Sequence, residues 1–261
     1  MDKELKGIWD SLKNEFSELL FVEESHTYFV AGQKLPSVSS LITNFYDEFD
    51  TESEALKYSL KKRLDIDDVK GAWTGENVRS TTKGTKIHNF AEDYAKWKYF
   101  NIGEKPTAFC KQSLGVIEFW NNLPTYLMPV ALEIQMYSKK YGYCGTADIL
   151  FYNLNDGTFV LGDYKTNKEL FSNPKFPSKP LKLLSKDLGL LQDNFGKYTL
   201  QFSFYQILLE NIGLEVSSRM LIWLRPDGSN LYSTHRTKDV SKELRELLEK
   251  ETFHTSPFKE F

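Results

Sequence analysis

The sequence predicts an α/β protein with a mixed central sheet flanked by helices and a helical N-terminal elaboration. The middle of the chain carries three β-rich stretches separated by short turn-like segments, and apolar residues at helical spacing precede and follow them. Of the 261 residues, 41% are hydrophobic and 15% aromatic, which suits one domain with a real core. Within this single domain, 1–261, we expect an N-terminal hairpin and helices in 1–80, the core in 81–235 and a C-terminal helix in 236–261.

The first elements are a helix, a β-hairpin and a second helix. Residues 3–19 have apolar side chains at helical spacing. Residues 20–38 contain short apolar stretches around a turn at Glu24-Ser25 and a second turn at Gly32, which is typical of a hairpin. Pro36-Ser37 then favours a helix entry into VSSLITNFY.

A long helical region precedes the strands. The pattern of residues 51–100 is helical, and we expect a break around Gly71 to Gly75 because glycine is a poor helix former. Another helix is predicted over about 106–122, ending near Pro124.

The periodicity then changes from that of a helix to that of strands. The three β-rich stretches are VALEIQMYS, YCGTADILFYN and TFVLGDYKT, and the turn-like segments between them are KKYG and NLNDG. After a long loop that contains NPKFPSKPLKLLSK, helix and strand patterns alternate. They predict a helix over about 197–212, the strand SSRMLIWLRP, a turn at Asp227-Gly228, the strand NLYSTHR and a helix near 239–250.

Composition excludes several classes of protein. Cys110 and Cys144 are the only cysteines, too few for a four-cysteine iron–sulfur or zinc site, and they indicate a reduced, cytoplasmic setting. No apolar run approaches the roughly 20 residues that cross a bilayer, and the charged start MDKELKGIWDSLKNEF has no signal-peptide core, so we expect no membrane partner. The net charge of -3 gives no global attraction for nucleic acid, so any DNA-binding surface has to be local.

Two carboxylates and a lysine are expected to meet on one face of the sheet. Asp163 and Lys165 are two residues apart on a strand, so their side chains point to the same side. If the preceding hairpin turns through the four residues Leu154 to Gly157, Asp148 lies opposite Asp163. If the turn is the dipeptide Asp156-Gly157, Asp148 becomes the diagonal neighbour, still on the same face.

A third acid joins them by the same counting. A turn around Lys140-Tyr141 would place Glu133 next to Asp148. Carboxylates at cross-strand distance repel one another, and a divalent cation with a preference for oxygen ligands removes that penalty. The ordinary alternative is a solvated sheet face with isolated ion pairs, which the short D-x-K pattern alone does not exclude.

Four segments resemble one family when they are taken together. GTADILFYNLNDGTFVLGDYKTNK is similar to the G-x-x-D … D-x-K-T core of RecB-like PD-(D/E)xK nucleases. GTKIHNFAE, with His88 and Glu92, resembles the upstream G-x-x-x-H-x-x-x-E helix of that family. QFSFY, with Gln201 and Tyr205, resembles the downstream Q-x-x-x-Y helix. The motifs occur in the order of the family over about 84–224, and the chain is most similar to phage-type and mitochondrial-type exonucleases.

The resemblance implies a restriction-endonuclease-like fold and a metal site. His88, Asp148, Asp163 and the backbone carbonyl of Tyr164 would bind one or two Mg²⁺ or Mn²⁺ ions. Lys165 would orient the attacking water and balance charge on the phosphate. Ala147 stands where the family name has a proline, and an aspartate replaces the glutamate, but both variants are common in the RecB-like branch.

The resemblance also implies the remaining roles. Glu133 matches a frequent acid of the first strand, as a metal ligand or an orienting group, and completes a catalytic set with Lys165, Asp163 and Asp148. Gln201 and Tyr205 would line a DNA groove near the scissile phosphate.

A basic segment directly follows the D-x-K motif. Lys168 belongs to it, and we expect it to bind DNA. Residues 165–197 hold seven lysines against three acidic residues, namely Lys165, Lys168, Lys175, Lys179, Lys182, Lys186 and Lys197 against Glu169, Asp187 and Asp193. We expect a DNA backbone to be guided along this loop. The alternatives are a plain solvated loop and a groove on the N-terminal helices, around Lys57, Lys61, Lys62 and Arg63.

The function that the resemblance implies is that of a metal-dependent DNA exonuclease in phage or bacterial recombination and repair. Its partners would be single-stranded DNA or duplex ends, with a recombinase or a single-strand-binding protein as a possible further partner. The alternatives are an endonuclease of the same superfamily, a non-catalytic DNA-end-binding module, and a glycosidase that uses Asp148 and Asp163 as paired carboxylates. A glycosidase leaves Lys165 and His88 without a role, and a non-catalytic module has no need of a complete ligand set.

Overall fold

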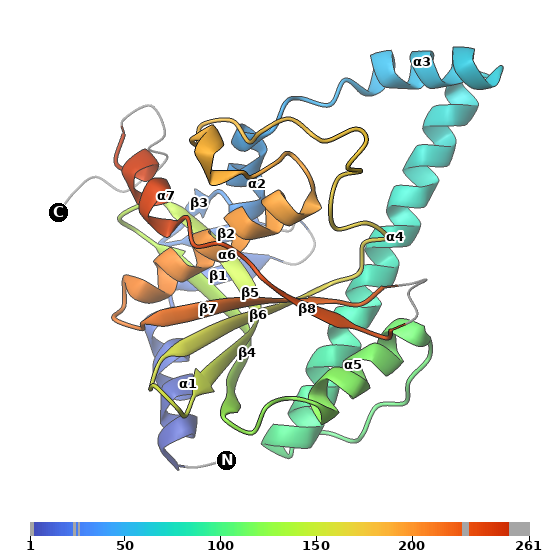
Figure 1. The fold of residues 1–261 in the computed structure, drawn as a ribbon. Coiled ribbons are helices and arrows are strands. Elements are labelled where there is room, and N and C mark those ends of the chain that lie inside the picture. The colour runs from blue at the N-terminus through green and yellow to red at the C-terminus, as the bar shows by residue number, and fades with distance from the viewer. Residues whose placement is uncertain (1–2, 23–24, 26, 226–229, 251–261) are drawn as a thin grey trace.

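The computed structural model describes residues 3–22, 25, 27–225 and 230–250 (Figure 1). Its centre is a five-stranded sheet in the order β4-β5-β6-β7-β8. β6 and β7 run parallel while the other neighbours run antiparallel, so the sheet is mixed, as predicted. The strands are β4 (Leu127–Ser138), β5 (Tyr143–Asn153), β6 (Phe159–Lys165), β7 (Val216–Trp223) and β8 (Ser233–Arg236).

Helices cover both faces of this sheet and enclose two hydrophobic cores. α6 (Asn194–Glu210) packs over a core that includes Leu161 of β6. α4 (Ile66–Ala95) and α5 (Lys111–Asn121) enclose the second core, which includes Val160 of the same strand. Because successive side chains of a strand point to opposite faces, β6 contributes to both cores and is buried on both sides.

The predicted N-terminal hairpin is a three-stranded sheet. Its strands β1 (Leu19–Val22), β2 (Thr27–Val30) and β3 (Gln33–Leu35) form an antiparallel meander. The turn predicted at Gly32 is confirmed, with glycine at a φ of 77°. The turn predicted at Glu24-Ser25 lies partly outside the described residues.

Short helices flank this meander. α1 (Lys3–Glu15) ends before the predicted residue 19 because Leu19 already belongs to β1. α2 (Val38–Ile42) starts after Ser37, as predicted, because the Ser37 side chain accepts a hydrogen bond from the Ser40 amide and caps the helix. The 3₁₀ turn η1 (Thr43–Phe45) follows α2 directly.

The predicted break at Gly71 to Gly75 is wrong. α3 (Thr51–Lys62) ends at Arg63, whose φ of 59° is left-handed, and α4 begins after Asp65. The Asp65 side chain accepts hydrogen bonds from the amides of Asp67 and Asp68, which fixes the start of α4. A glycine in a helix interior costs only about 1 kcal/mol, so the capped 30-residue helix runs through both glycines.

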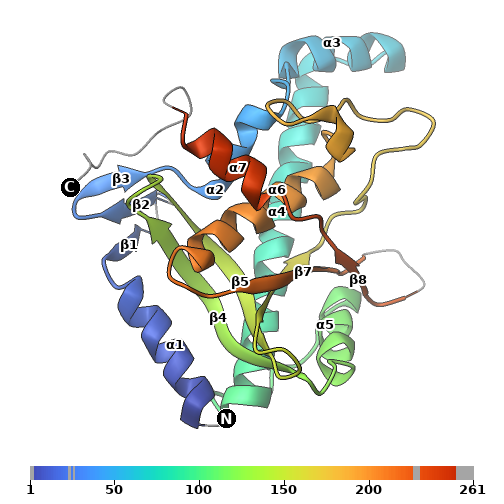
Figure 2. The same cartoon turned by 60° about the vertical axis from the view of Figure 1, so that its left-hand side comes forward.

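The remaining helix boundaries shift by a few residues from those predicted. α5 begins later than the predicted 106, and the π-helical turn η2 (Lys96–Phe100) ends the α4 region. α6 begins before the predicted 197, because Asp193 caps it through the amide of Gly196. α7 (Ser241–Leu248) lies within the predicted 239–250 and packs beside α6 (Figure 2).

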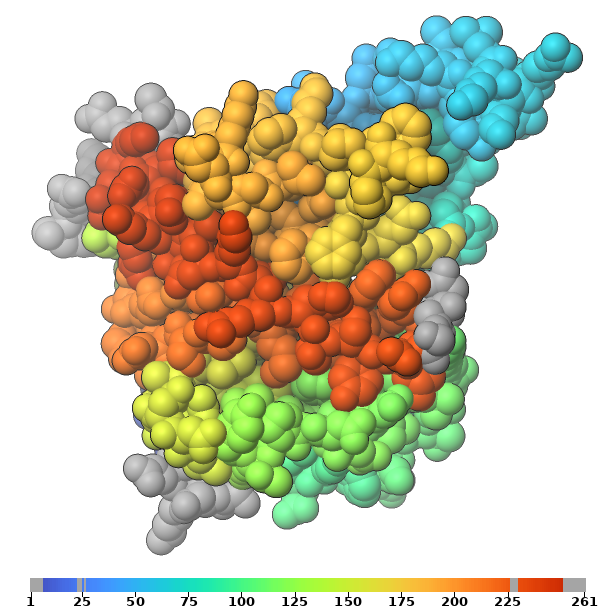
Figure 3. Space-filling model, viewed as in Figure 1, coloured from blue at the N-terminus to red at the C-terminus, as the bar shows by residue number. Residues whose placement is uncertain are grey.

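The basic loop between β6 and α6 crosses the surface between α7 and α3 (Figure 3, gold). It contains one 3₁₀ turn, η3 (Lys186–Leu188), and a bridge between Pro180 and Leu191. The turn predicted at Asp227-Gly228 lies outside the described residues. Among the helices of the described part of the chain, none has the length and apolar character that a membrane span requires.

Candidate metal centre

In the neighbouring strands β4 and β5, the side chains switch from one face of the sheet to the other at the same position. Ile134 of β4 and Ala147 of β5 pair with one another and belong to the core beneath α6. Leu132 and Ile149, which also pair, belong to the core beneath α4 and α5. Residues two apart in a regular strand share a face. Both strands therefore change face between these two pairs.

Glu133 and Asp148 are the residues at this change of face. Glu133 has a φ of 47°, in the left-handed region, which is unfavourable for a residue with a side chain by roughly 1–2 kcal/mol. Strain of this kind persists only where the surrounding structure fixes it. The strand pairs on either side of Glu133 and Asp148 confirm the prediction that the two residues are cross-strand neighbours.

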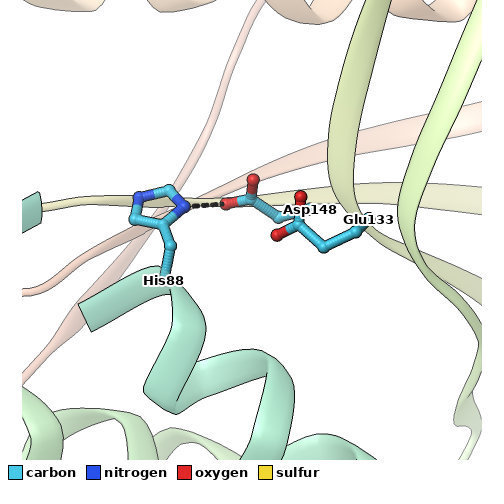
Figure 4. A group of neighbouring side chains, drawn as sticks. All are labelled: His88, Glu133 and Asp148. Atoms are coloured by element: carbon cyan, nitrogen blue, oxygen red, sulfur yellow. Dashed lines mark ion pairs between the residues drawn. The ribbon is translucent and has the colours of Figure 1, made fainter. Parts of the chain in front are cut away.

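His88 of α4 completes a cluster with these two acids (Figure 4). The nearest ligand atoms of His88, Glu133 and Asp148 all lie within 4.8 Å of one another, and each residue is partly buried. Nδ1 of His88 is 3.1 Å from Oδ2 of Asp148. One imidazole nitrogen and two carboxylates in such proximity are suited to Mg²⁺ or Mn²⁺. We refer to these three residues as the candidate metal centre.

Asp163 lies beside the candidate metal centre, but its carboxylate contacts Lys165. Nζ of Lys165 is 2.6 Å from Oδ1 of Asp163, and both side chains are almost fully buried, which confirms the same-face prediction. The Lys165 ammonium also lies 4.4 Å from the ring centroid of Tyr198 on α6. The expected ligand set contained Asp163, whereas the structure groups Glu133 with the other two side chains.

The register of the β5–β6 hairpin determines where Asp163 lies relative to Asp148. Ile149 pairs with Gly162, which corresponds to the four-residue loop and sets Asp148 opposite Asp163. The backbone amide of Tyr164 donates a hydrogen bond of 2.8 Å to Oδ2 of Asp148, while the Tyr164 ring is buried. The Tyr164 peptide thus contacts the centre through its N–H group.

The charges of His88 and Asp148 stabilise one another. Burial of His88 opposes its charged form, but the adjacent Asp148 carboxylate outweighs this and raises the pKa of His88 to about 9. Burial alone would raise the pKa of Asp148, but His88, then Lys165 and the Tyr164 amide, hold it below its usual value. Asp148 is therefore the carboxylate of the site that stays ionised most readily.

The other two acids of the site resist ionisation. Burial and repulsion from Asp148 raise the pKa of Glu133 to about 8 and that of Asp163 to about 7. Burial opposes the charge of Lys165, but Asp163 and its neighbours raise the pKa of the lysine above its usual value, so it stays protonated. When they are ionised, the buried carboxylates repel one another, and a divalent cation relieves this repulsion.

Glu92, the last residue of the GTKIHNFAE motif, contacts a lysine. Its carboxylate lies 2.6 Å from Nζ of Lys96, one turn further along the helix. Glu92 therefore forms a salt bridge within α4.

The downstream helix motif packs against the glycine of the G-x-x-D motif. A Cβ atom at Gly145 would lie 2.5 Å from the ring of Tyr205, so only glycine fits there. The Tyr205 ring is buried, and its hydroxyl accepts a hydrogen bond of 2.8 Å from Gln201. A DNA contact from this motif would therefore come from Gln201, which is partly exposed, and not from Tyr205.

A polar hollow of about 950 Å³ lies between α4, the residues that follow β6 and the start of α6. Gly84 of its lining lies one helical turn before His88, and Thr166 directly follows Lys165. Lys168 is part of the lining, with Nζ 3.5 Å from a carboxylate oxygen of Glu76. The lining of this α4 hollow consists of Glu76, Asn77, Arg79, Ser80, Thr81, Lys83, Gly84, Thr166, Asn167, Lys168, Glu169, Asn194 and Lys197.

Lys197 is a cation of this site whose role was not recognised individually from the sequence. It lines the α4 hollow and also a second hollow of about 590 Å³, which is bordered by Tyr46 and Lys182. Its position four residues before Gln201 places both side chains on one face of α6. Surrounding protein, together with the charge of Lys165, lowers the pKa of Lys197. The spacing K-x-x-x-Q could have drawn attention to it in the sequence.

Tyr198 and Asn167 are two further residues that the sequence analysis did not identify. The Tyr198 hydroxyl donates a hydrogen bond to Oδ1 of Asn167, and its ring contacts the Lys165 ammonium. The pair connects α6 to the residues that follow β6, and it thereby fixes Lys165. No local pattern indicates Tyr198, because its contact depends on how α6 packs on the sheet.

Lys179 and Lys182 of the loop are both paired with Asp47. Nζ of Lys179 lies 2.7 Å from Asp47, and Nζ of Lys182 lies 3.8 Å from the same carboxylate. The Lys182 amide also donates to the carbonyl of Phe45. The loop is thus fastened to η1, and these lysines offer less free charge than their number in the sequence indicated.

Comparison with known proteins assigns this chain to no family. The sequence matches no family model and no curated protein. Among solved structures, the crystal structure of SSO0001 is similar over 94% of this chain and 82% of that chain, with a TM-score of 0.36 and 16% sequence identity. Similarity at this level carries no conclusion about function.

Proposed function

We propose that the protein is a metal-dependent deoxyribonuclease with a restriction-endonuclease-like fold, related to the RecB-like PD-(D/E)xK nucleases that its motifs resemble. The observation that carries the proposal is the convergence of four separated motifs. His88, Glu133 and Asp148 lie together, the Asp163–Lys165 ion pair stands beside them, and Thr166, the next residue, lines a polar hollow. Three acids with one lysine have no structural need for such proximity.

The donor set fits a divalent cation. His88, Glu133 and Asp148 would hold Mg²⁺ or Mn²⁺, with Asp163 as a further carboxylate available beside them. Burial, and then the neighbouring Asp148 carboxylate, raise the pKa of both Glu133 and Asp163, and a bound cation would offset the cost of ionising them. When bound, the ion would supply Lewis-acid activation of water and of the phosphodiester.

Lys165 is the residue of this chain suited to meet negative charge on the phosphate. Burial and its contact with Tyr198 hold the ammonium in one place, so little reorganisation accompanies the reaction. Asp163 keeps Lys165 charged and oriented, because it raises the pKa of the lysine. The two residues would therefore act as one unit.

The α4 hollow is the proposed path for the DNA backbone. Four cations line it, Arg79, Lys83, Lys168 and Lys197, against the acids Glu76 and Glu169. The neutral lining is almost entirely hydroxyl and amide groups, which suit phosphate and sugar oxygens. A local excess of positive charge would attract DNA to this hollow even though the whole chain has a net charge of -3.

The motifs favour exonuclease action on single-stranded DNA or duplex ends, in phage or bacterial recombination and repair. A recombinase or single-strand-binding protein would be a natural partner for such an enzyme.

The test is cleavage of end-labelled single-stranded and double-stranded DNA with Mg²⁺ or Mn²⁺. We expect cleavage that EDTA abolishes and that Asp148→Asn and Lys165→Ala each lower by about 100-fold or more, with Lys34→Ala as the matched control. Lys34 is exposed on β3 and is not a member of the candidate metal centre or of the α4 hollow. Absence of cleavage on every substrate, or cleavage that survives EDTA and both variants, would refute the proposal.

A further inference from the structure

The second hollow, of about 590 Å³, meets the α4 hollow at Lys197. Lys197 is exposed at the start of α6 and lines both hollows. Beyond it, the lining of the second hollow comes mainly from α2, η1 and the segment 46–50, which leads from η1 to α3 (Figure 1). Lys182 of the basic loop also belongs to this lining. We refer to this space as the η1 hollow.

The η1 hollow differs from the α4 hollow in its charge. The α4 hollow has four cations against two acids, whereas the η1 hollow has Lys182 and Lys197 against Asp47 and Glu48. The charge of Lys182 is also partly satisfied, because its Nζ lies 3.8 Å from the Asp47 carboxylate. Phosphate groups are bound by an excess of lysine and arginine. The η1 hollow therefore suits a part of a nucleic acid that carries no charge.

The uncharged lining of the η1 hollow offers an aromatic ring and an amide. Phe49 is 67% exposed and belongs to none of the hydrophobic cores of the described residues. Its ring centroid is 6.4 Å from that of Trp73 on α4, and this contact holds the ring at the border of the hollow. Asn44 is exposed, and its side chain has no hydrogen-bond partner among the described residues. An exposed ring can stack on a base, and an amide can donate to and accept from the edge of a base.

We propose that the η1 hollow binds an unpaired base of the strand whose backbone follows the α4 hollow, with Phe49 as the stacking residue. The inference rests on the proposed function and adds a contact to a base to the contacts with the backbone. Lys197 connects the two hollows, so a single strand can place a phosphate at this lysine and the adjoining base on Phe49. A base inside a duplex is already stacked and paired, and only a single strand offers it at no further cost.

The base site lies at a distance from the candidate metal centre. Trp73, the partner of Phe49, precedes His88 by 15 residues on α4, roughly 22 Å at 1.5 Å per residue. The base would therefore belong to a nucleotide several positions from the scissile phosphate. Because Phe49 touches no residue of the candidate metal centre, its loss should change the affinity for single-stranded DNA and not the chemical step.

The first experiment measures binding of the full chain to a labelled single-stranded oligonucleotide and to a blunt G·C duplex, by fluorescence anisotropy in EDTA. Phe49→Ala should lower the single-strand affinity about 5- to 150-fold, the size of one base–aromatic stacking interaction, and leave the duplex affinity unchanged. Phe49→Tyr keeps the ring and should keep the affinity. The matched control is Phe109→Ala, because Phe109 is 54% exposed and lines neither hollow. Circular dichroism must show that each variant is folded.

The second experiment locates the base with an abasic site that is moved along the strand. At one position, removal of the base should lower the affinity of the wild type by the same factor as Phe49→Ala. Combined with Phe49→Ala, it should cause no further loss, because both changes remove the same contact. Lys197→Gln should instead lower the affinity for single-stranded and duplex DNA alike. In cleavage assays with Mn²⁺, Phe49→Ala should raise KM and leave the single-turnover rate at saturation unchanged.

The outcomes separate this inference from the proposed function. Single-strand affinity that is indifferent to Phe49→Ala, or abasic losses that add to that of the variant at every position, would overturn the base site. The nuclease assignment would then still stand on metal-dependent cleavage and its loss in Asp148→Asn. Equal losses for single-stranded and duplex DNA in Phe49→Ala would overturn the base site as well, and would assign the ring to the packing of the 46–50 segment on α4. A protein that neither binds nor cleaves DNA would refute the proposed function, and the base site with it.

Discussion

Lys165 offers the sharpest test of the proposed chemistry. We consider Lys165→Met, which removes the ammonium group while it keeps an unbranched side chain that can still pack against Tyr198. Removal of one preorganised electrostatic partner of a transition state lowers the rate by about 10²–10³, or roughly 2.7–4 kcal/mol. The same substitution also leaves Asp163 buried without the cation that lies 2.6 Å from it.

The stability of this variant follows from the pKa of Asp163. Breaking a buried ion pair by removing one partner usually destabilises by about 3–5 kcal/mol, because the other charge stays buried. The pKa of Asp163 is raised to about 7 even with Lys165 present, so at pH 7 the carboxyl group can take up a proton in place of the lost partner. Loss of Lys165 raises this folded-state pKa further, so the additional loss of stability accumulates as the pH rises from about 7 toward the higher pKa of the variant. We therefore expect the loss in unfolding free energy to stay below about 2 kcal/mol at pH 6 and to grow as the pH rises.

The assay is single-turnover cleavage of an end-labelled oligonucleotide with saturating Mn²⁺, together with urea unfolding at pH 6 and pH 8. Lys34→Met is the control, since it makes the same chemical change at an exposed position on β3. A Lys165→Met protein that cleaves at the wild-type rate would refute the assignment. A loss of stability that is the same at both pH values would refute the account of Asp163.

The other predictions concern metal, pH, substrate affinity and packing. Asp148→Asn and Glu133→Gln should each weaken Mn²⁺ binding in calorimetric titrations, and two variants that titrate like the wild type would place the metal elsewhere. Because Glu133 and His88 have pKa values raised to about 8 and about 9, and each loses its proton when it binds a cation, Mn²⁺ affinity should rise by up to roughly a hundredfold per pH unit between 6 and 8, with proton release measurable in buffers of different ionisation enthalpy. Lys197→Gln should lower DNA affinity and flatten its salt dependence by about 0.7 per single-strand contact, and an unchanged slope would remove Lys197 from the DNA path. Gly145→Ala should lower the free energy of unfolding by about 1–3 kcal/mol in urea denaturation, because its Cβ would overlap Tyr205, and a neutral result would contradict this packing.

Local periodicity in the sequence was enough to predict the central features of the site. Asp163 and Lys165 share a face because strand side chains alternate, and their ion pair confirms it. Counting across a short turn was also enough to place Glu133 beside Asp148. Hairpin register and side-chain alternation are properties of contiguous residues, so no knowledge of the rest of the fold was needed.

The choice between the two β5–β6 registers required the structure. The four-residue turn prevails because the amide of Asn153 bonds to the Thr158 carbonyl, and Asp156 accepts hydrogen bonds from the amide and hydroxyl of Thr158. The sequence NLNDG contains the residues for either turn. The prediction of a helix break at Gly71 to Gly75 was also wrong because it used local sequence alone. The cap at Asp65 and the packing of the far end of α4 outweigh the low helix propensity of glycine.

The sequence by itself determined the mixed α/β class, the same-face carboxylates and lysine, and the helix that carries His88. Only the tertiary structure decided which of these side chains lie closest to one another. It brought Glu133 and not Asp163 into the group with His88, fastened Lys182 to η1, and set Tyr198 under Lys165. The physical reason is that such contacts join residues far apart in the chain, and the packing of α4 and α6 on opposite faces of one sheet determines their distances.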